Sequence, residues 1–448
     1  MCKCNQFPIP NEGGVINWLQ GSILKNGDIN LVGFGIIGRQ KNERLSNMDI
    51  SRRSFLSGSA SAALLGVAGG CASLCGGERY PGWRLGEMDI HFIHTGQGEC
   101  TFFIFPDGTT MLLDCGYAEV RKAGYAEALP ASPSSSRRSG EWIRRYIERL
   151  IPQREIDYLM FSHWHSDHVR GLPDIVDSFR FRHFYDNQYP NFNLYNSGID
   201  PVGFDMVQNW LPGAQKDGTK HEAFKVGAKN QIRLQHDPRK YYQRVFEVRN
   251  LAANGSVWNG KNGARDLATV HVKKVGESKV SENLLSSAIR IRYGNFTYYT
   301  GGDIEGELVD ADGKIFSYEE VVGSVTGPVC ACKTNHHACP ASMREGFMRS
   351  LQPKLILSST WSPNQINDIT LERMTSRNFY PGDRTIAYGQ IPDFKKGAYA
   401  DRAFMRDIAP EGHAVIKVNP GGFAYRLYTL TTKDESMRIV GTKDFYCC

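Results

Sequence analysis

The segment from residue 160 to 172, Met-Phe-Ser-His-Trp-His-Ser-Asp-His-Val-Arg-Gly-Leu, carries four side chains that are typical metal ligands. They are His163, His165, Asp167 and His168, in the pattern His-x-His-x-Asp-His. Imidazole and carboxylate groups are the usual protein ligands of zinc and similar metals. Four such groups in so short a turn cannot all reach one ion, but they can serve two ions roughly 3.5–4 Å apart, as in metal-assisted hydrolysis. The motif therefore favours a two-metal site over a solvated histidine-rich loop.

The elements before this motif are expected to be strands and one helix. Apolar runs at 88–94, 100–105 and 109–114 predict three strands, with Pro-Asp-Gly as the turn between the last two. Residues 141–151 have helical periodicity, and 156–161 predict the strand that delivers the histidines at its carboxyl end. Sites at strand ends are typical of layered α/β proteins.

Downstream of the motif, a second carboxylate follows a predicted hairpin. Its strands, 284–293 and 296–300, end in Gly-Gly-Asp303. Further elements are a helix at 341–351 and strands at 355–358, 414–418 and 422–430. The intervening residues 187–265 are expected to form long loops around the mouth of a site. The order of strands and helices in the two halves is similar.

Together these pieces resemble the metallo-β-lactamase superfamily over about residues 88–430, and most closely its competence DNA-uptake (ComEC/Rec2-like) nuclease branch. The resemblance implies an α/β fold, the αββα four-layer sandwich. The matching segments are 95–100 (Thr-Gly-Gln-Gly-Glu-Cys), 112–116 (Leu-Leu-Asp-Cys-Gly), 162–168, 300–303 (Thr-Gly-Gly-Asp) and 333–337 (Lys-Thr-Asn-His-His). The chain departs from that branch after the last segment, where Ala-Cys replaces Gly-Ser.

The same resemblance implies two divalent metal ions, zinc or alternatively manganese or iron. His163 and His165 would hold the first ion, and Asp167 and His168 the second. Asp303 would bridge both ions.

The remaining roles also follow from the resemblance. One residue of the pair His336 and His337, expected to be His337, would complete the second site, and the other would be catalytic. Asp114 would orient a ligand histidine. Asp167 would also direct the attacking hydroxide, and Lys333 is either an anion-recruiting group or a solvated surface residue.

A further histidine of the first site cannot be placed from the sequence. The candidates between the main motif and Asp303 are His183, His221, His236 and His271. Because this ligand of the first metal is not identified, three functions stay open. Hydrolysis of phosphodiesters, in nucleic acid or a related substrate, is favoured over a β-lactam or lactone hydrolase. The alternative from another class is a cell-envelope binding protein with a degenerate metal site. A di-iron oxidoreductase would need a flavin domain that does not fit this length.

Composition sets broad limits. The 448 residues are 41% hydrophobic, with a net charge of +6, which suits a globular protein and does not by itself indicate nucleic-acid binding. Eleven cysteines in so long a chain exclude a small disulfide scaffold. Cys330, Cys332 and Cys339 lie near the histidine pair, where a disulfide or inert thiols are favoured over a redox or soft-metal site.

The N-terminal region predicts export. Arg52 and Arg53, followed by a short run of small apolar residues, resemble a twin-arginine signal over 48–75. Cys71 resembles a lipid attachment site, which would anchor the chain to a membrane. Residues 1–47 are expected to be a disordered leader or a mis-assigned start. The expected destination, through the twin-arginine machinery, is the periplasm or cell envelope. The remaining boundaries are a linker at 76–87, the domain at 88–432 and a tail at 433–448.

Overall fold

The computed structural model describes residues 77–117, 129–277, 279–362, 365, 367–391 and 393–447. The expected leader and export signal, with Arg52, Arg53 and Cys71, lie outside the described residues and stay predictions. Within the described part, none of the helices has the length and apolar character needed to cross a membrane.

The first half of the domain is built on a sheet that has nine strands among the described residues, in the order β19-β18-β17-β1-β2-β3-β4-β5-β6. Pairing is parallel from β3 to β6 and antiparallel elsewhere. The bounds are β1 Met88–Phe92, β2 Thr101–Ile104, β3 Thr110–Leu113, β4 Glu155–Met160, β5 Arg180–Tyr185, β6 Lys220–His221, β17 His413–Val418, β18 Ala424–Leu430 and β19 Ile439–Tyr446.

The second sheet has eight strands in the described part of the chain, in the order β16-β15-β14-β11-β10-β7-β8-β9. It too has a parallel portion, from β11 to β16. The bounds are β7 Phe246–Ala253, β8 Ser256–Trp258, β9 Ala264–Asp266, β10 Ala288–Tyr293, β11 Phe296–Thr300, β14 Ala331–Lys333, β15 Leu355–Ser358 and β16 Thr385–Tyr388. A separate hairpin pairs β12 Glu307–Val309 with β13 Ile315–Ser317.

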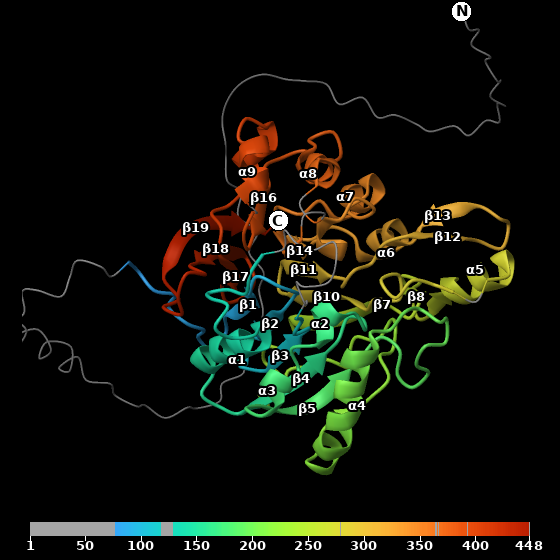
Figure 1. Cartoon of the computed structure of the whole chain (residues 1–448), viewed down its shortest axis with the longest axis horizontal. Helices are drawn as coiled ribbons and strands as arrows, with labels where there is room; N and C mark the ends of the chain where they lie inside the picture. Colours follow the sequence, from blue (N-terminus) through green and yellow to red (C-terminus); the bar gives the residue numbers. More distant parts are fainter. Residues whose placement is uncertain are drawn as a thin grey trace, which may run out of the picture. The chain divides into compact units, whose positions relative to one another are not determined.

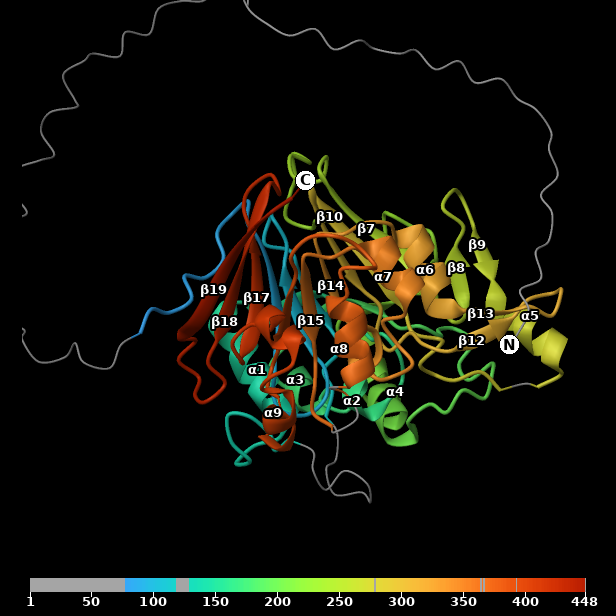
Figure 2. The same cartoon turned by 90° about the horizontal axis from the view of Figure 1, so that it is seen from above.

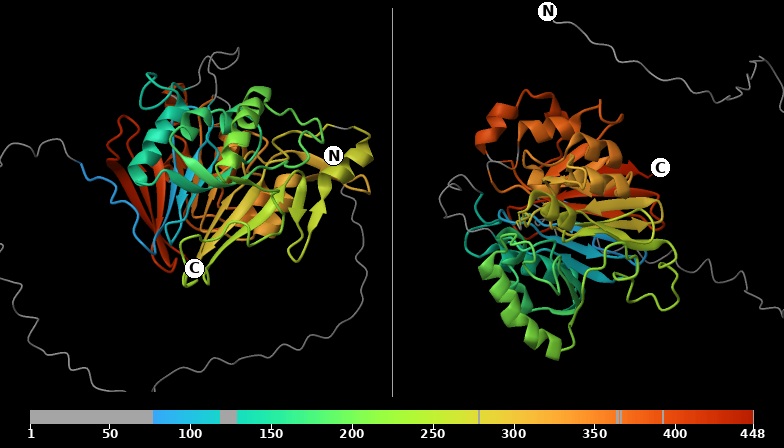
Figure 3. Two further views of the ribbon diagram at one scale, coloured as in Figure 1. Left: turned by 90° about the horizontal axis from the view of Figure 1, so that it is seen from below. Right: turned by 90° about the vertical axis from the view of Figure 1, so that its right-hand side faces the viewer.

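Helices cover the outer face of each sheet, so the layers run helix, sheet, sheet, helix (Figure 1, Figure 2). Helices α1, α3 and α4 pack on the nine-stranded sheet, and α6, α7 and α8 pack on the eight-stranded sheet. Figure 3 shows these two groups on opposite sides of the paired sheets. The bounds are α1 Ser139–Leu150, α2 Ser166–Val169, α3 Pro173–Val176, α4 Pro201–Lys216, α5 Leu267–Val275, α6 Tyr318–Thr326, α7 Glu345–Leu351, α8 Asp368–Thr375 and α9 Asp393–Tyr399, with 3₁₀ turns at Asn335–Ala338 and Ala403–Asp407. The predicted αββα sandwich is confirmed.

The two sheets are held together by apolar side chains on their facing surfaces. Ile90 and Phe103 of the first sheet belong to the same buried cluster as Ile291, Tyr298 and Leu355 of the second. Burying each such side chain contributes roughly 1.5–3 kcal/mol before entropy is counted. The shared core fixes the sheets face to face and brings the carboxyl ends of their parallel strands to one edge.

Two expected boundaries of the domain are wrong. The expected tail contains β19, which pairs with β18 over most of its length and places Phe445 against Tyr425 with ring centroids 4.9 Å apart. The expected linker also belongs to the fold at Tyr80, which is buried and donates a hydrogen bond to Asp89. Both segments are polar overall. Each contributes a single buried aromatic residue, Tyr80 or Phe445, and one such residue does not form an apolar run that would predict a strand.

The expectation of long loops between residues 187 and 265 is only partly correct. Helix α4 lies here, with Pro201 at its first turn and Asp200 accepting a hydrogen bond from Gly203 as its N-cap. Strand β7 also lies here and pairs with β10 in the interior of the second sheet. Charged residues within β7 obscure the strand pattern in the sequence.

Candidate metal centre

Five loops converge at the edge where the parallel strands of both sheets end. The histidine motif follows β4, Asp114 follows β3, and Glu99 precedes β2. From the second sheet, Asp303 follows β11 and the histidine pair follows β14. The site is therefore assembled from both halves of the sandwich, as expected for ligands placed at strand ends.

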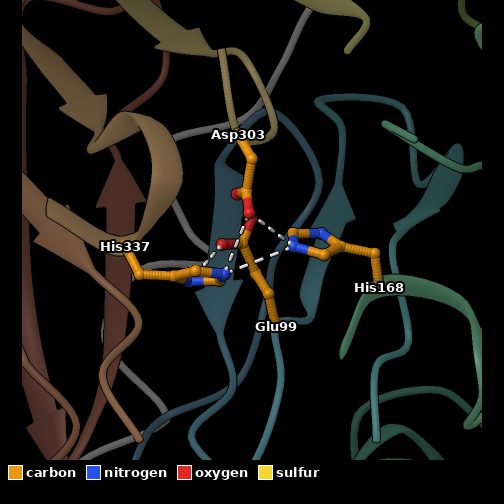
Figure 4. Close-up of side chains that lie close together, drawn as sticks. All are labelled: Glu99, His168, Asp303 and His337. Atoms are coloured by element: carbon orange, nitrogen blue, oxygen red, sulfur yellow. Dashed lines mark hydrogen bonds and ion pairs between the residues drawn. The ribbon is translucent and has the colours of Figure 1, made fainter. Parts of the chain in front are cut away.

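At the centre of this convergence lie four buried side chains, Glu99, His168, Asp303 and His337, which point toward one another (Figure 4). One ligand atom from each lies within 4.8 Å of all the others. Asp303 Oδ2 is 3.3 Å from His168 Nε2 and 3.3 Å from His337 Nε2. Two imidazoles and two carboxylates at this spacing are a donor set that suits zinc, manganese or iron.

Asp167 borders the same cluster. Its Oδ2 is 3.1 Å from His337 Nε2 and 3.8 Å from His168 Nε2. The structure thus brings together the residues expected for the second metal, with Glu99 as an additional carboxylate.

The residues expected for the first metal lie beside this cluster. His163 Nε2 is 3.1 Å from His165 Nδ1 and 3.8 Å from Asp303 Oδ2. His163 is fully buried, whereas His165 lines an open cleft. Asp303 is thus within reach of both sets of histidines, the position that a bridging ligand requires.

The candidates for a further ligand of the first site lie elsewhere. His183 and His221 interact with Glu222 and Asp186 around β5. His236 interacts with Asp157, and His271 accepts a hydrogen bond from the backbone N–H of Val309. None of the four is among the described residues that line the cleft. The sequence could not exclude them, because their distance from the cluster depends on the packing of α4, α5 and β5.

His336 is held apart from its neighbour by an unusual backbone. His336, His337 and Ala338 all have positive φ, at 40°, 49° and 59°. Non-glycine residues there cost of order 1–3 kcal/mol each, and they concentrate at functional sites. The two imidazoles diverge. His337 enters the cluster, whereas His336 Nδ1 lies 2.5 Å from Glu305 Oε2 and His336 Nε2 lies 3.3 Å from Asn283 Nδ2.

Asp114 contacts the ring nitrogen of His168 that faces away from the cluster. It lies 2.9 Å from His168 Nδ1 and accepts hydrogen bonds from the backbone N–H and hydroxyl of Ser162, each at 2.7 Å. A carboxylate bound to the far nitrogen of a ligand histidine fixes the ring and raises its basicity. This is the geometry of the orienting role expected for Asp114.

Glycine allows the loops to approach closely. A Cβ at Gly116 would overlap the backbone of Asp167, and one at Gly302, where φ is 52°, would lie 2.7 Å from Ser162 Cβ. The backbone N–H of Glu99 donates a hydrogen bond to Asp167 O at 2.9 Å. The glycines at these positions therefore let the backbones contact one another directly.

Two buried residues of the site were missed as functional groups. In the sequence, Glu99 is only one residue of a motif, and Lys333 is expected to be a surface or anion-recruiting residue. In the structure both are fully buried, and Lys333 Nζ lies 3.0 Å from Glu99 Oε2 and 3.7 Å from Asp303 Oδ1. Lys333 also donates a hydrogen bond to the carbonyl oxygen of Gly302. One sequence signal could have indicated both residues. Glu99 lies in the motif at 95–100, and Lys333 lies in the motif at 333–337 that also contains the histidine pair.

The carboxylates of the cluster create a negative potential that favours positively charged groups beside them. Burial alone would lower the pKa of His168, but the carboxylates of Asp303, Asp167 and Asp114 raise it well above its usual value. Burial also lowers the pKa of His337, but Asp303 and Asp167 outweigh this effect and raise the pKa to about 9. The carboxylates thus stabilise cationic imidazoles, and the same negative potential would stabilise a bound cation.

The cluster also contains buried acceptors with few partners. Among the described residues, Glu99 Oε1 has no hydrogen-bond partner, and Asp303 Oδ1 has only the 3.7 Å ion pair with Lys333. Buried polar atoms are normally hydrogen-bonded, and a bound ion is one of the recognised explanations for an exception. The donor set, its spacing and these acceptors fit divalent metal ions.

A cleft of about 630 Å³ gives access to the cluster. Its described lining includes three carboxylates, Asp167, Asp200 and Asp303, and one guanidinium, that of Arg170. The guanidinium is bonded to both oxygens of Asp200, at 2.6 and 2.7 Å. Apolar lining comes from Ile199, Pro201 and Trp361.

Comparison with known proteins agrees with this architecture. Residues 95–227 match the family model described as the metallo-beta-lactamase superfamily. A curated protein of Trichophyton verrucosum (strain HKI 0517), lactamase-like protein nscB, is 26% identical over 113 residues, or 25% of this chain and 34% of that protein. The chain spans about a third of the length of the curated relative it matches.

Solved structures are more distant. CmlA, a diiron beta-hydroxylase from Streptomyces venezuelae, has a TM-score of 0.32 and 12% identity over 61% of this chain and 45% of that one. A diphosphatase from the PhnP family has a TM-score of 0.31 and 11% identity over 74% of this chain and 97% of that one. These likenesses are too weak to bear on function. The nearer resemblance to the competence DNA-uptake branch stays a prediction.

Proposed function

We propose that this protein, whose residues 95–227 match the family model of the metallo-beta-lactamase superfamily, is a metal-dependent hydrolase with two divalent cations at the cluster described above. The observation that carries the proposal is the convergence of histidines and carboxylates from both sheets around Asp303 Oδ2. His163 and His165 would hold one ion, and Asp167, His168 and His337 the other, with Asp303 between them. Glu99 is close enough to join the second set.

The cations would supply a hydroxide nucleophile, by lowering the pKa of coordinated water toward about 7, and would polarise the substrate oxygen. The protein's own groups position the reactants. Asp167, which lines the cleft, would accept a hydrogen bond from the attacking group and direct it. His336, whose Nδ1 pairs with Glu305, would turn Nε2 from Asn283 to the substrate and donate a hydrogen bond from it to the charge that develops there.

Phosphodiesters are the substrate class that we favour. Two-cation sites are well suited to in-line displacement at phosphorus. Two of the described carboxylates in the cleft, Asp167 and Asp303, would bind the cations, and the third, Asp200, is paired with the Arg170 guanidinium. The guanidinium is therefore already engaged and offers less to the second negative charge of a phosphomonoester, which favours the singly charged phosphodiester. The apolar lining at Ile199, Pro201 and Trp361 supports a second candidate, a cyclic ester or amide such as a lactone or β-lactam.

The test combines elemental analysis with a substrate panel. We expect close to two equivalents of zinc, manganese or iron per chain, and faster turnover of bis(p-nitrophenyl) phosphate than of p-nitrophenyl phosphate, a lactone or a β-lactam. Asp303→Ala and His163→Ala should each lower turnover by at least about 10²-fold while circular dichroism stays unchanged, because each removes a metal ligand.

His183→Ala is the matched control, since that histidine interacts with Glu222 away from the cleft. Metal content near zero in protein purified without chelator would instead support a binding protein with a degenerate site. Turnover unchanged in Asp303→Ala would contradict the assignment of the cluster. Preferred turnover of the lactone or β-lactam would move the substrate to the second class and leave the metal site intact.

A further inference from the structure

Two cysteines far apart in the chain meet at the end of the sandwich opposite the metal centre. Cys330 lies immediately before β14, and Cys447 lies immediately after β19. They are 117 positions apart, yet their Sγ atoms are 3.1 Å apart. A disulfide bond is about 2.05 Å long, so the sulfurs need to approach by only about 1 Å.

The backbones around this pair are fixed by hydrogen bonds. The N–H of Cys330 bonds to the carbonyl oxygen of Thr297, and the N–H of Cys447 to that of Phe423. The Tyr425 hydroxyl donates to the carbonyl oxygen of Cys330 at 2.8 Å. Both cysteines therefore sit on hydrogen-bonded backbone and pack against the shared core.

The other cysteines of the core differ in environment. Cys100, Cys115 and Cys332 are fully buried among apolar side chains, and burial raises the pKa of each thiol. The hydrogen bond with Cys447 lowers the pKa of the half-buried Cys330 thiol. Thiolate, not thiol, is the attacking form in disulfide exchange.

We propose that Cys330 and Cys447 form a reversible disulfide that ties the edge strand β19 to β14, the strand whose other end leads to Lys333 and His337. The oxidant is a small disulfide such as oxidised glutathione. The Cys330 thiolate attacks one of its sulfurs and releases one small thiolate. Cys447 then attacks the mixed disulfide and releases the second. Two cysteine thiols are oxidised, one external disulfide is reduced, and both protons pass to the released thiols.

The bond would close a loop of more than 100 residues, the case in which a cross-link restricts the unfolded chain most. It would also secure β19, an edge strand that pairs with β18 alone among the described strands. The inference is independent of the proposed hydrolase function.

The full chain is incubated with oxidised glutathione, alkylated and digested without reductant. We expect mass spectrometry to find the peptides of Cys330 and Cys447 joined, and dithiothreitol to separate them. The oxidised protein should melt several degrees higher than the reduced protein. Cys330→Ser and Cys447→Ser should each lose both the joined peptides and the redox-dependent shift in melting temperature.

Two variants serve as controls. Cys339→Ser, in the metal-site cleft, should retain the joined peptides and the shift. Cys448→Ser should also retain them, which separates Cys447 from the cysteine next to it. Unjoined peptides after oxidation, or a cross-link that persists in Cys447→Ser through Cys448, would overturn the proposal.

Discussion

Asp114 shows how one residue outside the metal-binding set can control it. Its φ of 58° lies in the left-handed region, which turns the carboxylate back toward Ser162 and His168. Both oxygens are used, one by the backbone N–H of Ser162 and the other by the Ser162 hydroxyl and His168 Nδ1. The ring of His168 is thereby fixed with Nε2 toward Asp303.

The residue-scale prediction is that Asp114→Asn weakens metal binding by about 10–100-fold, because an amide orients the ligand histidine less strongly than a carboxylate. Asparagine tolerates positive φ, so the backbone should persist. Competition for zinc against a chromophoric chelator measures the affinity. Asp157→Asn, at a buried aspartate that bonds to Thr110, is the control. Equal zinc affinities in the Asp114→Asn variant and the wild type would contradict an orienting role for Asp114.

At the same scale, the sequence predicted side chains that lie in a dense local motif and missed those that pair across the fold. His163, His168 and Asp303 were all expected near one another, because motif order and strand ends identify them. The burial of Lys333 against Glu99 was not, since it requires contact between the segment after β14 and the segment before β2. A single lysine gives no local sign that it will be buried.

At the scale of elements, β19 closes the nine-stranded sheet and was not predicted. Only Phe445 of its eight residues is buried, and four of the others are charged or exposed large side chains: Val440, Lys443, Asp444 and Tyr446. The strand therefore forms because its backbone pairs with β18, and the hydrophobic pattern of its own sequence does not predict it. Strands β1, β4 and β15 were predicted correctly because each carries several apolar residues in a short run: they alternate with polar residues in β1, and they are consecutive in the second half of β4 and in most of β15.

The element-scale prediction follows from this pairing. Truncation after residue 432 removes β19 and exposes the ring of Tyr425 and the edge of β18. We expect the free energy of unfolding to fall by more than about 3 kcal/mol, the lower cost of deleting one buried Phe. Urea unfolding measures it, and truncation after Tyr446 is the control. Retention of wild-type stability in the shorter chain would show that residue 432 is a true domain end.

At the scale of the molecule, the two sheets meet through an apolar core on their facing surfaces and through the metal centre at one edge. The centre takes His168 from the first sheet and Asp303 and His337 from the second. The carboxylates of the cluster raise the pKa values of His168 and His337 and lie close to Lys333, so they create a negative potential that a cation would relieve. A bound ion would therefore link the two halves as well as supply the chemistry.

The molecule-scale prediction is that metal stabilises the whole domain. A ligand that binds only the folded state at 100 times its dissociation constant adds about 2.7 kcal/mol. Removal of metal with EDTA should therefore lower the melting temperature, and added zinc or manganese should restore it. In His168→Ala the difference between chelated and metal-supplemented protein should largely disappear, because one ligand of the linking set is gone. An equal response to EDTA in this variant and the wild type would place the stabilising ion elsewhere, since the cluster around Asp303 could not then be its site.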